Sequence, residues 1–297
     1  MQTIIQGYKI TTFFTIKEQQ MKKELLMLAV HASLEAGAKI MSVYTDPDSD
    51  FEIEKKADNS PLTIADRKSH EVISEILSTT GIPVLSEEGK KLPYETRKSW
   101  NELWIVDPLD GTKEFIKKNG EFTVNIAFVK NGVPMSGVIY IPVKKELYIG
   151  DSEYGAYKIS DITEISAEET FDSLVSHAEA LPLKKKNNDE NGIQEKQNIV
   201  IVASRSHLSA ETEEFINKMK SVYKSVETVS KGSSLKLCLI AEGNADIYPR
   251  FAPTMEWDTA AGHAIIKAAG KDVYHTDEIT PLKYNKEDLL NPWFIAK

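Results

Sequence analysis

The sequence contains a single cysteine, Cys238, so no disulfide can form within the chain. This fits a reducing compartment, and the apolar surroundings of Cys238, residues 235–241, indicate a buried packing residue. Positive charge is also in deficit: the chain has 36 basic and 45 acidic residues, which give it a net charge of −9. Binding to nucleic acid polymers or broadly to anionic membranes is therefore not expected, since both depend on an excess of positive charge.

Long apolar runs are missing as well, and none approaches the roughly 20 residues that span a bilayer. The first eight residues show no basic segment followed by an apolar one, so neither a signal peptide nor a transmembrane segment is expected. Residues 1–20 differ in composition from the rest of the chain and are interpreted as an N-terminal extension. We expect a cytoplasmic location.

With 297 residues, 41% of them apolar and 27% charged, the chain has the composition of an ordinary globular protein. Residues 21–170 are expected to form an α+β half around an antiparallel sheet, because two amphipathic helices precede a run of strands. Asn131-Gly132 is a strong hairpin signal within that run. The helices are expected over residues 21–44 and 63–79, and the strands over 51–56, 82–85, 103–106, 122–130, 135–141, 146–150 and 155–159.

Residues 171–297 alternate between strand and helix patterns, which predicts an α/β half. The polar stretch 184–198 lacks aromatic residues and is interpreted as an exposed, charged loop inserted in this half. Strands are expected over residues 199–203, 225–229, 245–248 and 271–275, and helices over 210–219, 233–242 and 259–269.

The most informative motif is Asp107-Pro-Leu-Asp-Gly-Thr112, which directly follows the expected buried strand 103–106. Aspartate, proline and glycine are common turn formers, so a solvated turn is the structural alternative. A turn here could instead aim the carboxylates of Asp107 and Asp110 and the carbonyl oxygen of Leu109 at one point, a ligand set suited to Mg²⁺. Gly111 and Thr112 then open a segment whose free N–H groups could hold a phosphate. The motif predicts metal-assisted phosphate hydrolysis.

Other acids extend this pattern. Glu87 and Glu88 also follow a strand, and adjacent carboxylates repel each other unless a cation is present, but spacing does not decide which one binds. Asp66 lies three residues after Thr63, a spacing that favours a helix capping box over a water-orienting role. Asp258 lies at a helix start, where an acid is also favourable without any ligand.

An anionic substrate of this acidic protein must meet local cations. Lys236 and Arg250, together with Ser233, are the best candidates, because each lies near the end of an expected strand or the start of an expected helix. His207, in another polar tip after a strand, would by itself more often be structural.

Taken in order, Glu87-Glu88, Asp107–Thr112 and Trp257-Asp258 resemble the inositol monophosphatase superfamily of metal-dependent, lithium-sensitive phosphatases. Within it, residues 107–125 are most similar to the CysQ-type 3'(2'),5'-bisphosphate nucleotidases, since inositol phosphatases usually have Thr-Asn-Phe in place of Lys113-Glu-Phe115. Ser204–His207 and Gly232–Lys236 carry further similarity. The resemblance covers roughly residues 21–295.

The resemblance implies a layered αβαβα sandwich of the sugar-phosphatase type, with two or three Mg²⁺ ions between its halves, in residues 21–170 and 171–297. It also implies a setting in sulfur assimilation, a nucleotide bisphosphate as small-molecule partner, and a peripheral association with the inner face of the cell membrane. The implied metal ligands are Glu87, Asp107, Leu109, Asp110 and Asp258; the catalytic residues are Asp66, Glu87 and Thr112; and the substrate contacts are Gly111, Thr112, His207, Ser233, Lys236 and Arg250.

The expected reaction is hydrolysis of the 3'-phosphate of adenosine 3',5'-bisphosphate to AMP and phosphate. Inositol monophosphatase or fructose-bisphosphatase activity is the alternative with the same metals. A non-catalytic nucleotide or metal sensor is the alternative from a different class, and the number of convergent oxygen ligands argues against it.

Overall fold

The computed structural model describes residues 2–56, 61–183, 198–203 and 209–297, without the side chains of residues 2–17. The helices are α1 (Gln2–Tyr44), α2 (Ile64–Ser78), α3 (Tyr94–Arg97), α4 (Thr112–Ile116), α5 (Phe171–Ser176), α6 (Ala210–Val222), α7 (Leu235–Glu242) and α8 (Glu256–Ala268). The strands are β1 (Glu54–Lys55), β2 (Pro61–Leu62), β3 (Val84–Ser86), β4 (Glu102–Asp110), β5 (Thr123–Lys130), β6 (Val133–Ile141), β7 (Glu146–Asp151), β8 (Gly155–Ile159), β9 (Glu179–Ala180), β10 (Asn198–Ala203), β11 (Ser225–Ser230), β12 (Tyr248–Arg250), β13 (Val273–His275) and β14 (Phe294–Ala296).

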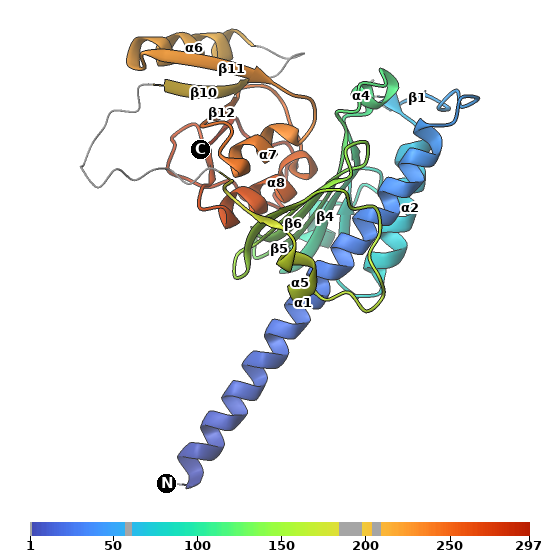
Figure 1. Cartoon of the computed structure of the whole chain (residues 1–297), viewed down its shortest axis with the longest axis vertical. Helices are drawn as coiled ribbons and strands as arrows, with labels where there is room; N and C mark the ends of the chain where they lie inside the picture. Colours follow the sequence, from blue (N-terminus) through green and yellow to red (C-terminus); the bar gives the residue numbers. More distant parts are fainter. Residues whose placement is uncertain (1, 57–60, 184–197, 204–208) are drawn as a thin grey trace.

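A seven-stranded sheet in the order β3-β4-β5-β6-β7-β8-β9 forms the centre of the molecule. Helices α1 and α2 cover one face, and α8, with α7 packed on it, covers the other (Figure 1). Beyond α7 and α8 lie the parallel pair β10-β11, the antiparallel group β12-β14-β13 and the outer helix α6. This is the expected αβαβα sandwich.

Strand β4 shows why the sheet needs helices on both faces. Its side chains alternate: Leu103 and Ile105 belong to the core beneath α7 and α8, while Trp104 and Val106 belong to the core beneath α1 and α2. An uninterrupted apolar run is typical of a strand that is buried on both sides. The acids that follow this run are therefore held at the end of a rigid central element.

Helix α8 lies very close to the sheet because two strands carry glycine beneath it. A Cβ atom at Gly137 would lie 2.4 Å from the carbonyl oxygen of Ala261, and one at Gly150 would lie 2.4 Å from the Cα atom of Ile265. Larger residues at either position would push the helix away. This contact fixes the height of the α8 N-terminus, which carries Asp258.

Most expected elements are confirmed, including the Asn131-Gly132 hairpin, where both residues have positive φ angles of 52° and 75°. Three expectations are wrong. Helix α1 begins at Gln2 rather than at residue 21. Only Glu54 and Lys55 form a strand within 51–56, because Phe51 and Glu52 have positive φ. The strand expected at 245–248 lies at Tyr248–Arg250, and β14 was not anticipated.

The expected charged loop at 184–198 lies outside the described residues up to position 197, and Asn198 begins β10. The boundary at residue 170 stays a prediction. Strand β9, although it follows that boundary, pairs with β8 in the large sheet.

Within the described residues, one helical segment, Glu18–Tyr44 in α1, is long and apolar enough to cross a membrane by length and composition. In the fold it is a core helix, since 56% of its apolar window is buried and Leu26, Val30 and Ile40 pack beneath the sheet. Figure 1 shows the N-terminal end of α1 projecting beyond the sandwich. The expectation of no transmembrane segment stays a prediction.

Candidate active site

The Asp107–Asp110 segment belongs to strand β4, so the expected turn at these residues is wrong. In a regular strand, residues three apart point to opposite faces, which would separate the two aspartates. Between Asp107 and Asp110, however, β4 advances three residues while its partner β5 advances two, from Asn125 to Thr123. This one-residue bulge reorients the strand so that both carboxylates reach the same site.

The turn comes one residue later, at Gly111, whose φ of 93° is in the left-handed region. A Cβ atom there would lie 3.1 Å from the carbonyl oxygen of Glu121 and 3.2 Å from the Cβ of Ser233. Glycine is therefore required both for the backbone conformation and for space. It starts helix α4 and places Thr112 beside the carboxylates.

Three carboxylates from both halves of the fold converge here. Ligand oxygens of Asp107, Asp110 and Asp258 all lie within 4.8 Å of one another. Asp258 is held by the start of α8, where it accepts a hydrogen bond of 2.8 Å from the backbone N–H of Met255. The helix-start role and the cluster role are thus compatible, since one oxygen caps the helix.

The electrostatics of this cluster favour a cation. Burial raises the pKa of Asp107 well above its usual range, and the charges of Glu87, Asp110 and Asp258 raise it further. Burial, followed by the charges of Asp110 and Glu87, raises the pKa of Asp258 to about 8. Like charges held together without water are costly unless a metal neutralises them. The all-oxygen donor set fits a hard divalent ion.

Glu87 adjoins the cluster, and its pKa is raised by burial although Lys56 opposes the shift. The Lys56 ammonium lies 2.7 Å from Oε1 of Glu87 and also forms an ion pair with Glu88. Lys56 was missed by the sequence reasoning, because a lysine in an irregular segment 31 residues away carries no local signal. The structure places both glutamates at the site, and Glu87 as a ligand remains a proposal.

Asp66 caps the helix, as its spacing favoured, and its second oxygen contacts Thr112; its water-orienting role stays a prediction. Its Oδ2 accepts hydrogen bonds from the backbone N–H of Thr63 at 2.7 Å and from the Thr63 hydroxyl at 2.5 Å, as in a capping box. Its Oδ1 accepts a hydrogen bond of 3.2 Å from the hydroxyl of Thr112. The Thr112 hydroxyl also lies 3.5 Å from the carbonyl oxygen of Leu109. Burial raises the pKa of Asp66 to about 6, although its bonds to Thr63 oppose the shift.

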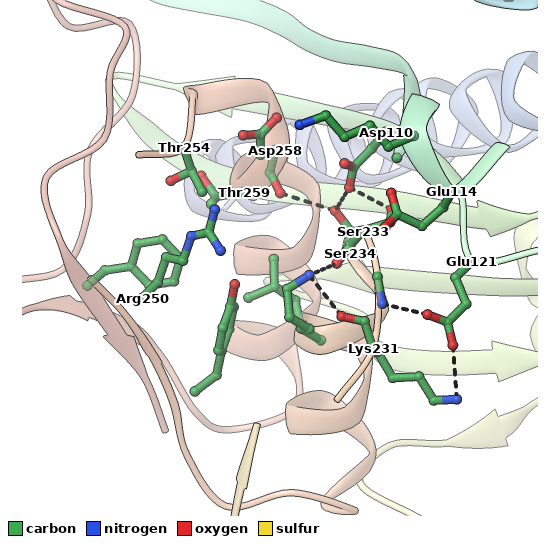
Figure 2. A pocket seen from close by; sticks show the side chains of 17 residues that line it. Asp110, Glu114, Glu121, Lys231, Ser233, Ser234, Arg250, Thr254, Asp258 and Thr259 are labelled. Carbon is green, nitrogen blue, oxygen red and sulfur yellow. Dashed lines mark hydrogen bonds and ion pairs between the residues drawn. The ribbon is translucent and has the colours of Figure 1, made fainter. Parts of the chain in front are cut away.

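The loop before α7 reaches over to the carboxylate cluster. The hydroxyls of Ser233 and Ser234 each lie 2.7 Å from Oδ2 of Asp110, and Figure 2 shows both residues pointing toward that carboxylate. Ser233 adopts a positive φ of 49° to do so. The loop is anchored by Glu121, which lies just before β5 and accepts a hydrogen bond of 2.8 Å from the N–H of Gly232.

A pocket of about 180 Å³ opens beside this cluster and contains the expected cations (Figure 2). Lys236 is buried, its Nζ donates to the carbonyl oxygen of Ser233 at 2.6 Å, and burial lowers its pKa to about 8. Arg250 donates from Nη2 to the carbonyl oxygen of Pro253 at 3.0 Å, while its buried Nε has no hydrogen-bond partner among the described residues. An anionic ligand oxygen would satisfy these donors.

The structure therefore gathers most of the predicted site. The pocket is lined by Asp110, Gly111, Ser233, Lys236, Arg250 and Asp258, and a carboxylate oxygen of Asp107 lies within 4.8 Å of those of Asp110 and Asp258. Glu114, Glu121, Tyr248 and Thr254 line it as well and were not predicted, because no local pattern marks residues that approach only in the fold. His207 lies outside the described residues.

The carboxylate pKa values predict a pH-dependent stability for the metal-free protein. A carboxyl group whose folded pKa is raised stabilises the fold fully below its unfolded pKa of about 4, and this contribution is lost as pH rises through the folded value. The window therefore runs from about pH 4 to about 6 for Asp66 and to about 8 for Asp258. We expect the melting temperature in EDTA to fall between pH 5 and pH 8.5, and saturating Mg²⁺ to remove most of that fall. Parallel melting curves with and without Mg²⁺ would contradict the metal site.

Comparison with known proteins shows which family the chain is similar to. The model of the Inositol monophosphatase family matches residues 21–293. The curated 3'(2'),5'-bisphosphate nucleotidase CysQ of Escherichia coli K12 is 43% identical over 262 residues, which cover 87% of this chain and 94% of that protein. The crystal structure of CysQ from Bacteroides thetaiotaomicron has 57% sequence identity and a TM-score of 0.83, with 93% and 97% of the two chains covered. An inositol monophosphatase from Anabaena sp. PCC 7120 is more distant, with 26% identity, a TM-score of 0.62, and 92% and 89% of the chains covered.

Proposed function

The chain belongs to the inositol monophosphatase family, and we propose that it is a Mg²⁺-dependent 3'(2'),5'-bisphosphate nucleotidase that converts adenosine 3',5'-bisphosphate to AMP and phosphate. The identity to CysQ over most of both chains supports the nucleotide substrate. The proposal includes a cytoplasmic location, which is in keeping with the single cysteine. It also includes a peripheral association of the protein with the inner face of the cell membrane.

The observation that carries the proposal is the convergence of Asp107, Asp110 and Asp258 beside a pocket lined by Lys236 and Arg250. A phosphomonoesterase needs oxygen ligands for metal next to the scissile phosphate, and a bisphosphate needs a second, cationic subsite. Both needs are met within one pocket. A site for a neutral polyol such as inositol would have little use for a buried lysine and a half-buried arginine.

The proposed metal ligands are Asp107, Asp110, Asp258, Glu87 and the carbonyl oxygen of Leu109. When bound there, two or three Mg²⁺ ions would lower the pKa of the attacking water and neutralise charge on the departing oxygen. Asp107 and Asp110 would hold the metal ions in a fixed position, because both lie on β4, a strand that is buried on both faces.

The remaining residues position the water and the substrate. Asp66 and Thr112 form a hydrogen-bonded pair next to the cluster that can orient the attacking water and accept its proton. The water oxygen bonds to phosphorus, and the bond from phosphorus to the ribose 3' oxygen breaks. That oxygen takes a proton from solvent and leaves as a hydroxyl, while Asp66 returns the proton of the attacking water to solvent. Gly111 and Thr112 offer backbone N–H groups to the scissile phosphate, while Ser233, Lys236 and Arg250 hold the 5'-phosphate; His207 is proposed as a further substrate contact.

The test is phosphate release with Mg²⁺ from adenosine 3',5'-bisphosphate and from inositol 1-phosphate at equal concentration. We expect a strong preference for the nucleotide and complete loss of activity in EDTA that added Mg²⁺ restores. A preference for inositol 1-phosphate would keep the metal site and overturn the substrate. Tight nucleotide binding without phosphate release from either compound would indicate a non-catalytic binder.

A further inference from the structure

One oxygen of Asp110 collects the hydrogen bonds. Its Oδ2 accepts from the hydroxyls of Ser233 and Ser234, each at 2.7 Å, and lies 3.4 Å from the side-chain nitrogen of Asn125. Of the hydrogen bonds made by described residues, none reaches Oδ1. Hydrogen bonds thus fix the carboxylate through Oδ2, and Oδ1 is left to bind the metal ion of the proposed site.

Asn125 controls the direction of this network. It is 1% exposed on β5, directly opposite Asp107 in the sheet. Its side-chain nitrogen donates to the Ser234 hydroxyl oxygen at 2.9 Å, and its side-chain oxygen accepts from the Thr123 hydroxyl at 2.8 Å. The amide nitrogen must face this way, because Asp110 next to it is an acceptor.

The single hydroxyl proton of Ser234 determines which acceptor this serine can bond. A serine hydroxyl has one proton to donate, and the Ser234 oxygen lies within reach of two acceptors, Oδ2 of Asp110 at 2.7 Å and the carbonyl oxygen of Asp258 at 3.1 Å. Because Asn125 already donates to Ser234, the serine proton is directed away from Asn125. It points toward Asp110, since this carboxylate is the nearer of the two acceptors and carries a charge.

We propose that Asn125 is a positioning residue for the metal ligand Asp110 and acts through Ser234, to which its amide donates at 2.9 Å, rather than through its longer contact of 3.4 Å with Asp110 itself. Neither residue would touch the ion. The chain Asn125–Ser234–Asp110 links β5, the start of α7 and β4, and so ties a ligand of one half to a loop of the other. This inference rests on the metal site of the proposed function and assigns the residues that hold that site ready.

The experiment measures binding of Mn²⁺ alone, by titration followed by electron paramagnetic resonance, in the full chain and in Ser234→Ala, Asn125→Leu and the double variant. Loss of a partner behind a metal ligand typically weakens metal binding roughly 10–100-fold. We expect about a tenfold loss in each single variant. If Asn125 acts through Ser234, the double variant will bind about as weakly as Ser234→Ala alone, because the effects of one chain do not multiply.

The matched control is Ser33→Ala, since Ser33 is an equally buried serine whose hydroxyl donates to the carbonyl oxygen of Val30 in α1, remote from the cluster. Its Mn²⁺ affinity should equal that of the unsubstituted protein. Metal-free melting temperatures separate lost positioning from lost folding. Ser234→Ala removes a single atom, so it remains decisive if Asn125→Leu does not fold.

Unchanged Mn²⁺ affinity in Ser234→Ala or in a folded Asn125→Leu would overturn the inference, and so would losses that multiply in the double variant. Failure of the unsubstituted protein to bind Mn²⁺ would overturn the metal site of the proposed function and the inference with it. Because the assay contains no nucleotide, an error in the substrate assignment would leave the Mn²⁺ results unaffected.

Discussion

Replacing Asp110 with asparagine is expected to lower kcat for phosphate release by more than about 100-fold, the upper end for residues that only support a metal ligand. Asparagine is neutral and nearly the same size, so the substitution removes the negative charge between Asp107 and Asp258 with little change in shape. The measurement is the steady-state rate at saturating Mg²⁺ and nucleotide.

The same variant should be more stable than the unsubstituted protein when metal is removed. The charge of Asp110 raises the pKa of both Asp107 and Asp258, so its loss relieves repulsion in the empty cluster. We expect a higher melting temperature in EDTA and a smaller gain on addition of Mg²⁺. Asp288→Asn, at an exposed aspartate, is the control and should change neither quantity. Retention of most activity in Asp110→Asn would refute the proposed site.

Charge reversal at Arg250 is expected to change substrate preference rather than chemistry. In Arg250→Glu, kcat/KM for adenosine 3',5'-bisphosphate should fall by about 100-fold or more, because like charges in contact cost several kcal/mol and each 1.4 kcal/mol is a factor of ten. Inositol 1-phosphate has no second phosphate, so its hydrolysis should change by less than about fivefold on the same reasoning.

The control for this second prediction is Lys218→Glu, which makes the same change of charge at an exposed position on α6. Both substrates should be hydrolysed normally by that variant. Equal losses on both substrates in Arg250→Glu would mean that Arg250 supports the metal site or the fold, and would remove it from the proposed 5'-phosphate subsite.

Local sequence patterns predicted the helices, strands and turns well where residues close together in the sequence determine the structure. The amphipathic period of α2, the asparagine-glycine turn between β5 and β6 and the apolar run of β4 depend on neighbours within a few positions. The dense acids of Asp107–Asp110 likewise indicated a cation site. Family resemblance, rather than spacing, supplied the proposed catalytic role of Asp66, because its position three residues after Thr63 by itself favours a capping box.

Tertiary structure decided what the local patterns could not. The one-residue bulge between Asp107 and Asp110 depends on the register with β5, and the sequence of β4 does not contain that register. Lys56 reaches Glu87, and Ser234 and Asn125 reach Asp110, across separations in sequence of 31, 124 and 15 residues. The sequence by itself determined which chemical groups are available, because composition and short motifs are local; the packing of α8 and α7 on the sheet determined which of those groups meet, because distances between remote residues exist only once the core has formed.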